Sequence, residues 1–352
     1  MTSTSSLAPL RVGLIGAGGI ANSHHKGYTK AGAQIIGFAE PVAQTRARRE
    51  IEWDIPGYET LEQLLAVDGL EAVSICTPNS THAPATIAAA KAGKHVLCEK
   101  PLSLNLLECE AMIAAASKAG IVLQTGHHLR ANWYANKARA LIDEGAIGRV
   151  CYVRLRQAHD WGGNKIISPN FASLERSGGG TLLDNGCHMM DLARYLAGDV
   201  KSVFARTATL GFEIEVEDVG AVSLEFQSGA LGTVEAAWTA TGWEEGFWVY
   251  GTDAALECTN RLGKRTLRFA HRQGTGSDWA KLDETIYDVQ DEGGHSEEIA
   301  AFIRSIKTGT PPICSGEDGL ESVRLVLSAY QSARERRVID LEGLAIANIN
   351  TN

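Results

Sequence analysis

Two segments of this 352-residue chain carry side chains that could move a proton. Asp184 and His188 lie four positions apart in GGGTLLDNGCH, so on a helix both project from one face. An imidazole, with an ordinary pKa of about 6.5, accepts a proton near neutral pH. Lys100 follows the apolar run HVLCE, and its amine, with an ordinary pKa of about 10.4, would need a pKa lower by roughly 2 to 3 to share that role. His188 is therefore the preferred proton acceptor.

A glycine-rich turn near the start of the chain predicts a nucleotide site. Gly16-Ala17-Gly18-Gly19-Ile20-Ala21 follows an apolar run, and its glycines let backbone N–H groups approach a pyrophosphate at a helix N-terminus. Glu40 ends the next apolar run 22 positions after Gly18, the spacing of an acid that holds a ribose diol. The 2′-phosphate of NADP would place negative charge beside the Glu40 carboxylate. Their repulsion would cost on the order of 4 kcal/mol per pair of unit charges, at a separation of about 4 Å and a dielectric of about 20. NAD is therefore the expected cofactor, unless an arginine folds back onto a phosphate: Arg46, Arg48 or Arg49.

The elements that must position these residues change in character along the chain. Strands alternate with helices up to about residue 126, at 11–18, 34–40, 72–78, 95–101 and 121–126, which predicts a doubly wound parallel sheet. After a helix at 133–148, strands follow one another directly, at 149–159, 201–210, 220–227, 231–240 and 246–251. Further helices are expected near 181–197, 295–308 and 317–336. The chain is therefore predicted to be α/β, with a nucleotide-binding domain at 1–128 and an α+β domain with a large, mostly antiparallel sheet at 129–352.

Composition and charge disfavour several classes of protein. With 33 basic and 42 acidic residues the net charge is -9, which disfavours binding to nucleic acid or an anionic membrane. We find neither a signal-peptide pattern nor a run of about 18 uncharged apolar residues, so we expect a cytoplasmic protein without a membrane span. The seven cysteines form no CxxC pair and no nearby Cys/His cluster, so we expect reduced thiols and no metal.

Three motifs resemble the Gfo/Idh/MocA family of oxidoreductases. They are CTPNSTH at 76–82, GKHVLCEKPLS at 93–103 and GGGTLLDNGCH at 178–188. The resemblance implies an N-terminal Rossmann domain, an open-faced C-terminal sheet, NAD, and a sugar or polyol such as an inositol, oxidised at a hydroxyl by hydride transfer to nicotinamide. It implies that Lys100, Asp184 and His188 line nicotinamide and substrate. We expect Lys100 to hold the oxygen and Asp184 to orient His188 or sugar hydroxyls, with the base role left open between Lys100 and His188.

Weaker candidates follow the same strand ends. Cofactor contacts are expected from Thr77, Asn79, His82, Glu99 and His128, although His82 serves equally well as a hydrogen-bonding residue at a helix start. Substrate contacts are expected from Arg130, Trp161 and Asn164, although Arg130 could simply pair with a carboxylate. The chain departs from the family pattern at Glu40, at Ala21, and in Arg130-Ala131-Asn132-Trp133, where the last change bears on substrate identity.

Two other functions stay open alongside a dehydrogenase. Some relatives cleave glycosides by oxidising a ring hydroxyl transiently and returning the hydride, and others are non-catalytic NAD-binding regulators. The intact Lys100, Asp184 and His188 argue against a regulator. Because relatives associate through the open face of the second sheet, which would otherwise expose a large apolar area, we expect a homodimer or homotetramer.

Overall fold

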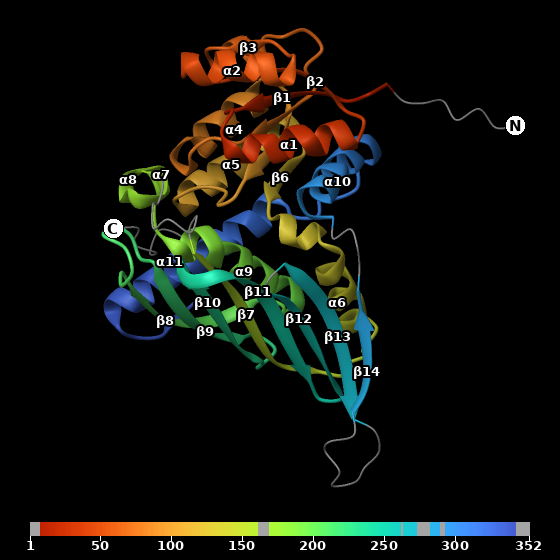
Figure 1. The fold of residues 1–352 in the computed structure, drawn as a ribbon, viewed down its shortest axis with the longest axis vertical. Helices are drawn as coiled ribbons and strands as arrows, with labels where there is room; N and C mark the ends of the chain where they lie inside the picture. The colour runs from red at the N-terminus through yellow and green to blue at the C-terminus, as the bar shows by residue number, and fades with distance from the viewer. Residues whose placement is uncertain (1–7, 161–168, 262, 273–281, 289–292, 343–352) are drawn as a thin grey trace, which may run out of the picture.

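A computed structural model describes residues 8–160, 169–261, 263–272, 282–288 and 293–342. Figure 1 shows a front domain stacked above one end of a second, larger sheet. The front sheet has the order β3-β2-β1-β4-β5-β6, and all of its pairs are parallel. Its strands are β1 (Arg11–Ile15), β2 (Gln34–Ala39), β3 (Gly57–Tyr58), β4 (Ala72–Ile75), β5 (His95–Glu99) and β6 (Leu123–Gly126). The strand order reverses between β1 and β4, the point at which such sheets bind dinucleotides.

Helices and short 3₁₀ turns connect the strands of the front domain. They are α1 (Gly19–Lys30), α2 (Ala43–Trp53), α3 (Leu61–Leu65), η1 (Asn79–Thr81), α4 (His82–Lys91) and α5 (Leu106–Ala119). Strands β1, β4 and β5 are almost entirely buried, as expected of a parallel sheet covered on both faces. The predicted doubly wound domain is confirmed, and the two-residue strand β3 is an addition to it.

The second sheet has nine strands in the order β14-β13-β12-β11-β7-β10-β9-β8-β15. Its strands are β7 (Val150–Asp160), β8 (Val200–Ala208), β9 (Val219–Phe226), β10 (Leu231–Ala237), β11 (Thr239–Gly251), β12 (Ala254–Arg261), β13 (Lys264–Arg272), β14 (Leu282–Tyr287) and β15 (Ile339–Asp340). Neighbouring strands are antiparallel except β7 and β10. The predicted mostly antiparallel sheet is confirmed.

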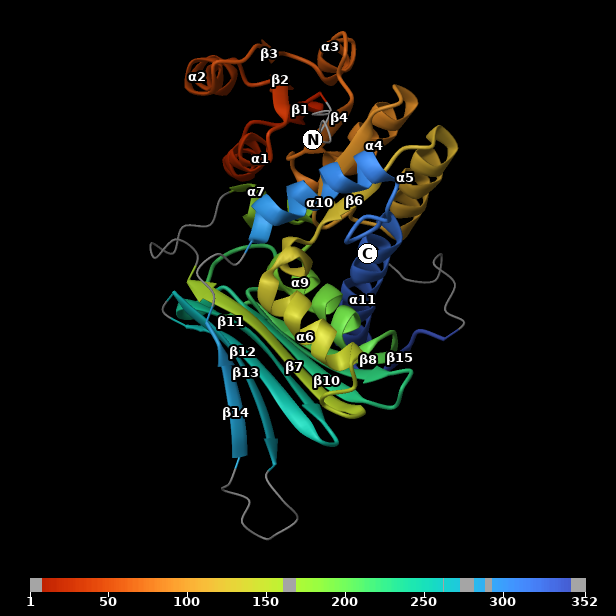
Figure 2. The same cartoon turned by 90° about the vertical axis from the view of Figure 1, so that its right-hand side faces the viewer.

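Helices cover one face of this sheet, and the other face has no helix over it in Figure 2. The covering helices are α6 (Trp133–Asp143), α9 (Thr181–Ala197) and α11 (Gly316–Glu335), and η2 (His128–Ala131) joins β6 to α6. The short helices α7 (Pro169–Ala172) and α8 (Leu174–Ser177) precede α9. The Asp184 and His188 motif therefore lies in a helix, as predicted, and this helix packs on the sheet.

The chain returns to the front domain in its last quarter. Helix α10 (Gly294–Thr308) packs against α1, and its Ile299 and Phe302 are buried in one cluster with Val12 and Tyr28. A Cβ on Gly27 would lie 2.4 Å from Cδ1 of Ile299, so the two helices approach closely at a glycine. Residues beyond the predicted boundary at 128/129 thus complete a core of the front domain. Within the described segments, no helix has the length and apolar character of a membrane span.

Candidate active site

Helix α9 carries Asp184 and His188 and begins at a glycine-rich turn. The backbone N–H groups of Gly180 and Leu182 each donate to the carboxylate of Glu217 at 2.9 Å, so Glu217 satisfies the free donors of the first helical turn. A Cβ on Gly180 would lie 1.8 Å from the backbone oxygen of Glu217, which explains the glycine at this position. The turn therefore fixes where the helix starts. The four-residue spacing of Asp184 and His188 places both side chains on one face of this helix, its reactive face.

Asp184 pairs with Lys100, a contact that the sequence did not predict, and its expected role in orienting His188 or sugar hydroxyls stays a prediction. Nζ of Lys100 donates to Oδ1 of Asp184 at 2.6 Å and to its backbone oxygen at 3.2 Å. Burial by itself lowers the pKa of Lys100, but the charge of Asp184 and the hydrogen bond to it outweigh burial and raise the pKa. The lowered pKa that a shared base role would need is therefore not found. Lys100 is a positively charged donor across the gap between β5 and α9.

His188 is held through a chain of hydrogen bonds that sets its proton positions. Oγ of Ser322 donates to the backbone oxygen of Gly319 at 2.9 Å, and Nε2 of His127 lies 2.9 Å from the same Oγ. When the hydroxyl gives its one proton to Gly319, His127 donates to it from Nε2, and Nδ1 of His127 is then the acceptor that faces Nδ1 of His188 at 3.4 Å. In this arrangement of protons, Nε2 is the unprotonated ring nitrogen of His188.

The pKa of His188 also favours the neutral form. Burial lowers it first, and the charge of Lys100 and the nearby imidazoles of His127 and His128 lower it further. The ring of His128 stands edge-on to that of His188, with centroids 4.7 Å apart. A neutral imidazole beside a protonated amine suits a proton acceptor next to an oxygen-binding donor.

The turn between β1 and α1 leaves room for a dinucleotide. A Cβ on Gly18 or Gly19 would meet no atom within 4 Å, whereas a Cβ on Gly16 (φ +89°) would lie 2.6 Å from the backbone oxygen of Cys76. Gly16 is therefore needed for the turn itself, and the other two glycines keep the N-terminus of α1 open to a pyrophosphate. Ile20 follows in the first turn of α1 and is half-buried.

Glu40 lies beside this turn, as its spacing predicts. Its carboxylate accepts hydrogen bonds from the backbone N–H groups of Ala17 at 3.1 Å and Val42 at 2.9 Å. At the end of β4, the buried hydroxyl of Thr77 has no hydrogen-bond partner among the described residues. An open glycine turn, a fixed acid and an unpaired hydroxyl at neighbouring strand ends fit the pyrophosphate and ribose groups of NAD.

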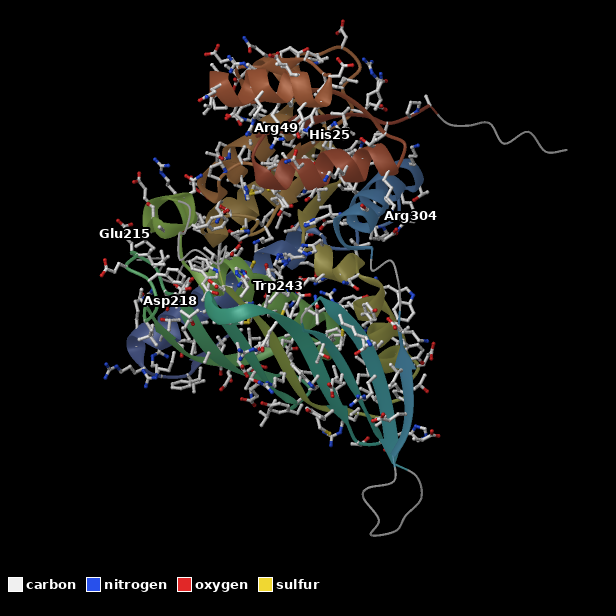
Figure 3. All side chains as sticks on the ribbon, viewed as in Figure 1. His25, Arg49, Glu215, Asp218, Trp243 and Arg304 are labelled. Atoms are coloured by element: carbon white, nitrogen blue, oxygen red, sulfur yellow. The ribbon has the colours of Figure 1, made fainter. Side chains whose placement is uncertain are left out.

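Two arginines of α2 fold back towards the turn, but onto protein oxygens. Arg46 donates to the backbone oxygen of Glu40 at 2.6 Å, and Arg49 donates to the backbone oxygens of Ala17 at 3.0 Å and Gly18 at 3.3 Å. Figure 3 labels Arg49 within the front domain. Since carbonyl oxygens hold these guanidinium groups, the two arginines brace the turn, and ribose binding by Glu40 stays a prediction.

Three of the weaker cofactor candidates make contacts within the protein. Both ring nitrogens of His82 face backbone oxygens, those of Pro101 at 2.8 Å and Thr77 at 3.0 Å, which favours its structural alternative. Asn79 donates to the backbone oxygen of Ser177 at 3.0 Å and so links η1 to α8. The carboxylate of Glu99 lies 2.7 Å from Nε2 of His24 and accepts from the N–H of Lys100. Contact of these side chains with the cofactor stays a prediction.

Arg130 is used inside the protein, which favours the second of its two expected roles. Its Nε and one terminal nitrogen each donate to Asp191 at 2.8 Å, and Asp318 lies 3.1 Å away. All three guanidinium nitrogens have partners, and the side chain is 8% exposed. The other two predicted substrate residues, Trp161 and Asn164, lie outside the described residues.

Trp243 is an aromatic side chain near the site that the sequence analysis missed. It is 44% exposed and stacks on His159 with centroids 4.8 Å apart and planes 2° apart. Nε2 of His159 lies 3.3 Å from Oδ1 of Asn185, the residue after Asp184. A register shift between Thr239 and Trp243 redirects the strand here. Figure 3 labels Trp243 at the end of the large sheet that faces the front domain.

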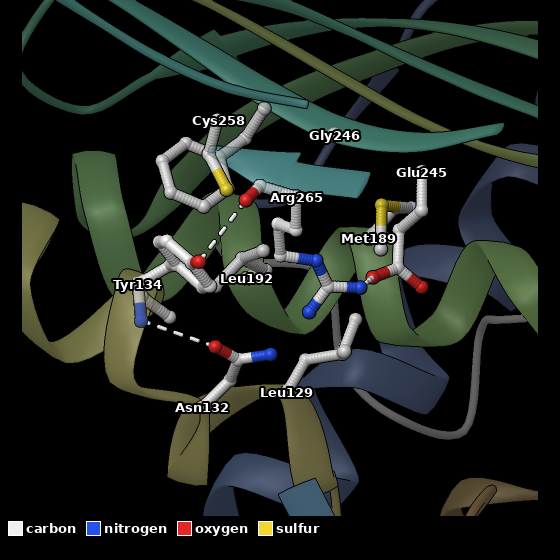
Figure 4. A pocket seen from close by; sticks show the side chains of 11 residues that line it. Leu129, Asn132, Tyr134, Met189, Leu192, Glu245, Gly246, Cys258 and Arg265 are labelled. Carbon is white, nitrogen blue, oxygen red and sulfur yellow. Dashed lines mark hydrogen bonds and ion pairs between the residues drawn. The ribbon is translucent and has the colours of Figure 1, made fainter. Parts of the chain in front are cut away.

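The pocket shown in Figure 4 lies away from this constellation. It is bounded by apolar side chains such as Leu129, Met189 and Leu192, and by the ion pair of Glu245 with Arg265. Lys100, Asp184 and His188 are not among its lining residues. The pocket is a gap in the packing between α9 and strands β11 to β13, and the reactive side chains define the site instead.

The fold and the side chains together define a class of protein. A dinucleotide site at the switch point of a Rossmann sheet faces a helix that supplies a neutral imidazole and a carboxylate-bound amine. This arrangement is that of an oxidoreductase that uses a nicotinamide cofactor on CH–OH groups.

Comparisons with known proteins give the family. Residues 10–127 match an oxidoreductase family with an NAD-binding Rossmann fold, and residues 135–257 match the GFO/IDH/MocA C-terminal domain. The chain is 32% identical to the myo-inositol 2-dehydrogenase of Thermotoga maritima, over 95% of this chain and 99% of that protein. It is 33% identical to the 1,5-anhydro-D-fructose reductase of Ensifer adhaerens, over 94% and 98%. The structure of levoglucosan dehydrogenase with NADH superposes with a TM-score of 0.87 at 25% identity, over 95% and 99%.

The chain belongs to the Gfo/Idh/MocA family. The predicted family, Rossmann fold and NAD cofactor are confirmed, and the protein is an NAD-dependent oxidoreductase.

Proposed function

We propose that the chain oxidises a hydroxyl of a sugar, sugar derivative or inositol-like polyol. The observation that carries this proposal is the buried His188, whose lowered pKa keeps it neutral, next to the Lys100–Asp184 pair. The names of relatives support the substrate class, since they include a myo-inositol 2-dehydrogenase and a levoglucosan dehydrogenase.

Each side chain then has a distinct task. Lys100 donates a hydrogen bond to the substrate oxygen and stabilises negative charge on it, while Asp184 keeps the amine protonated and in place. His188 accepts the hydroxyl proton at Nε2, and His127 with Ser322 holds the ring in the required tautomer. Trp243 offers an indole face on which the apolar face of a sugar ring stacks. Held at the glycine turn and Glu40, NAD would supply the acceptor for the hydride that leaves the carbinol carbon.

A substrate panel tests the proposal. Purified protein is incubated with NAD and with inositols, monosaccharides, an anhydrosugar and a nitrophenyl glycoside, while reduced nicotinamide is followed by absorbance. Net reduction with a sugar or polyol is the expected result. Glycoside cleavage without net reduction would support the transient-oxidation alternative, and NAD binding with neither reaction would support a regulator.

Two substitutions test the residues. Lys100→Ala and His188→Ala should each lower kcat by at least about 100-fold, the effect of removing a positioned proton-transfer or charge-stabilising group. NAD affinity, measured by fluorescence titration, should stay close to that of the wild type, because Glu40 and the glycine turn remain. Near-normal kcat in both variants would contradict the site.

Location and assembly belong to the same proposal. We infer a cytoplasmic enzyme from the sequence pattern and a homodimer or homotetramer formed through the helix-free face of the second sheet.

A further inference from the structure

A second cluster of ionisable side chains lies beside the proposed active site and is not used in the proton transfer proposed above. It contains His24 of α1, Glu99 at the end of β5, and His295 and Glu298 of α10. One donor atom from each of these four side chains can be chosen so that all lie within 4.8 Å of one another. Three separate chain segments supply them, so the sequence shows no metal-binding pattern and the sequence analysis expected no metal.

We propose that His24, Glu99, His295 and Glu298 bind one divalent transition-metal ion of the zinc type. Two imidazole nitrogens and two carboxylate oxygens form a mixed donor set that suits Zn²⁺, with bonds of about 2.0 to 2.2 Å. Mg²⁺ and Ca²⁺ prefer sites made of oxygen donors alone, so imidazoles select against them.

Glu298 is the independent observation that points to an ion. Its side chain is 0% exposed, and neither carboxylate oxygen has a hydrogen-bond partner among the described residues. Nδ1 of His295 lies 3.5 Å from its Oε2. A buried carboxylate without hydrogen bonds is costly, and a bound cation satisfies both oxygens at once.

The histidines also have donor atoms to spare. Nδ1 of His24 and Nδ1 of His295 are buried and without hydrogen-bond partners among the described residues. His295 and Glu298 are three positions apart, so they share one face of α10. That helix packs directly against α1, which supplies His24. A metal bound here joins α1, β5 and α10, and thereby fastens the returning helix to the front domain.

The competing occupant of the cluster is a proton. Burial raises the pKa of Glu298, and a protonated carboxyl group carries no charge that an ion must balance. A test must therefore measure the ion itself rather than the stability of the cluster.

The experiment is a calorimetric titration of the full chain with Zn²⁺ after dialysis against a chelator. We expect one Zn²⁺ per chain, a higher melting temperature with Zn²⁺, and no measurable heat with Mg²⁺. Glu298→Gln and His295→Asn should each weaken Zn²⁺ binding by at least about tenfold, since even residues that only support metal ligands cost that much. His295 is partly exposed, so its variant tests the site even where a substitution at buried Glu298 disturbs folding.

Neighbouring residues supply matched controls. Glu297 precedes Glu298 but is paired with Arg304 at 2.9 Å, and His25 follows His24 but stacks on Trp53. Figure 3 labels His25 and Arg304 at the surface of the front domain. Glu297→Gln and His25→Asn should bind Zn²⁺ as the wild type does. Absence of Zn²⁺ binding by the wild type overturns the proposal, as does binding that both Glu298→Gln and His295→Asn leave unchanged.

Discussion

The protonation state of His188 should control how activity depends on pH. Burial and the charge of Lys100 hold the pKa of His188 below its ordinary value of about 6.5, and the ring accepts a proton only while neutral. Activity should therefore persist below pH 6.5 and fall as the pH drops through the lowered pKa. The measurement is kcat/KM against pH, which reports groups of the free enzyme.

Lys100→Met is the matched variant for this profile. It removes the positive charge but keeps a chain of similar length, so the pKa of His188 should rise and the acid limb should move up towards pH 6.5. An acid limb above about pH 6.5 in the wild type, or a downward shift in the variant, would contradict the assignment of His188 as base.

Trp243 should contribute to sugar binding without affecting the chemical step. Trp243→Ala removes an exposed indole that His159 holds in place, so KM for the sugar should rise by about tenfold, equivalent to about 1.4 kcal/mol. The values of kcat and KM for NAD should change little, because the indole does not contact Lys100 or His188 in the described contacts. Trp243→Phe retains an aromatic face and serves as the control. A fall in kcat with unchanged KM would assign Trp243 a different role.

The family resemblance identified the reactive residues but not their partners. Asp184 and His188 were assigned from a motif that resembles the family's, and their four-residue spacing on a helix supported the assignment. Their bonds go to Lys100 and His127, which lie 84 and 61 positions away, and no local pattern encodes such pairs. The raised pKa of Lys100 was missed for the same reason. For Arg130 the sequence left substrate binding and pairing with a carboxylate open, and the contacts with Asp191 and Asp318 favour the second.

The start of α9 is the element on which the reactive face depends. In Gly180→Ala, the new Cβ would lie 1.8 Å from the backbone oxygen of Glu217, so the turn must move. We expect a loss of roughly 1 to 3 kcal/mol in the free energy of unfolding, as for overpacking elsewhere, measured by denaturant titration. A lower kcat should accompany it, because Asp184 and His188 move with the helix.

Gly220→Ala on β9 provides the control for this prediction. Its Cβ would meet Leu182 at an ordinary contact distance of 3.4 Å, so stability and kcat should both be close to those of the wild type. If Gly180→Ala and Gly220→Ala changed stability and kcat equally, the turn before α9 would not specifically require a glycine.

Helices and strands with buried, apolar runs could be predicted from the sequence. Strands with one uncovered face were harder to find. The predicted helix at 181–197 coincides with α9, which begins after Gly180 and ends before Gly198. Strands β12, β13 and β14 were missed, because segments such as KRTLRFAHR carry many charged side chains on a sheet with one uncovered face. Strand β3 has only two residues and gives no periodic signal.

At the scale of the whole molecule, the packing of α10 is what the sequence does not convey. Its apolar periodicity predicts a helix with one buried face, but periodicity does not say which domain that face contacts. Ile299 and Phe302 join the front core although they come from the second half of the chain. The proposed metal cluster exists only because of this return.

The uncovered sheet face carries the last prediction, which concerns assembly. It is less apolar than the sequence suggested: Arg154 pairs with Glu235 at 3.0 Å and Arg156 pairs with Glu244 at 3.1 Å. Trp248 lies beneath Arg154, with the guanidinium carbon 5.0 Å from the ring centroid.

If a second copy covers this face, Trp248→Glu should place an unpaired charge in the interface and shift the protein to monomers, as measured by sedimentation velocity. Val42, which is 55% exposed and precedes the first residue of α2, gives the control Val42→Glu, which should leave assembly unchanged because α2 lies at the opposite end of the molecule from this sheet in Figure 1. A monomeric wild type would contradict the predicted assembly. Normal assembly of the Trp248→Glu variant would show that this face stays exposed to solvent and does not form the interface.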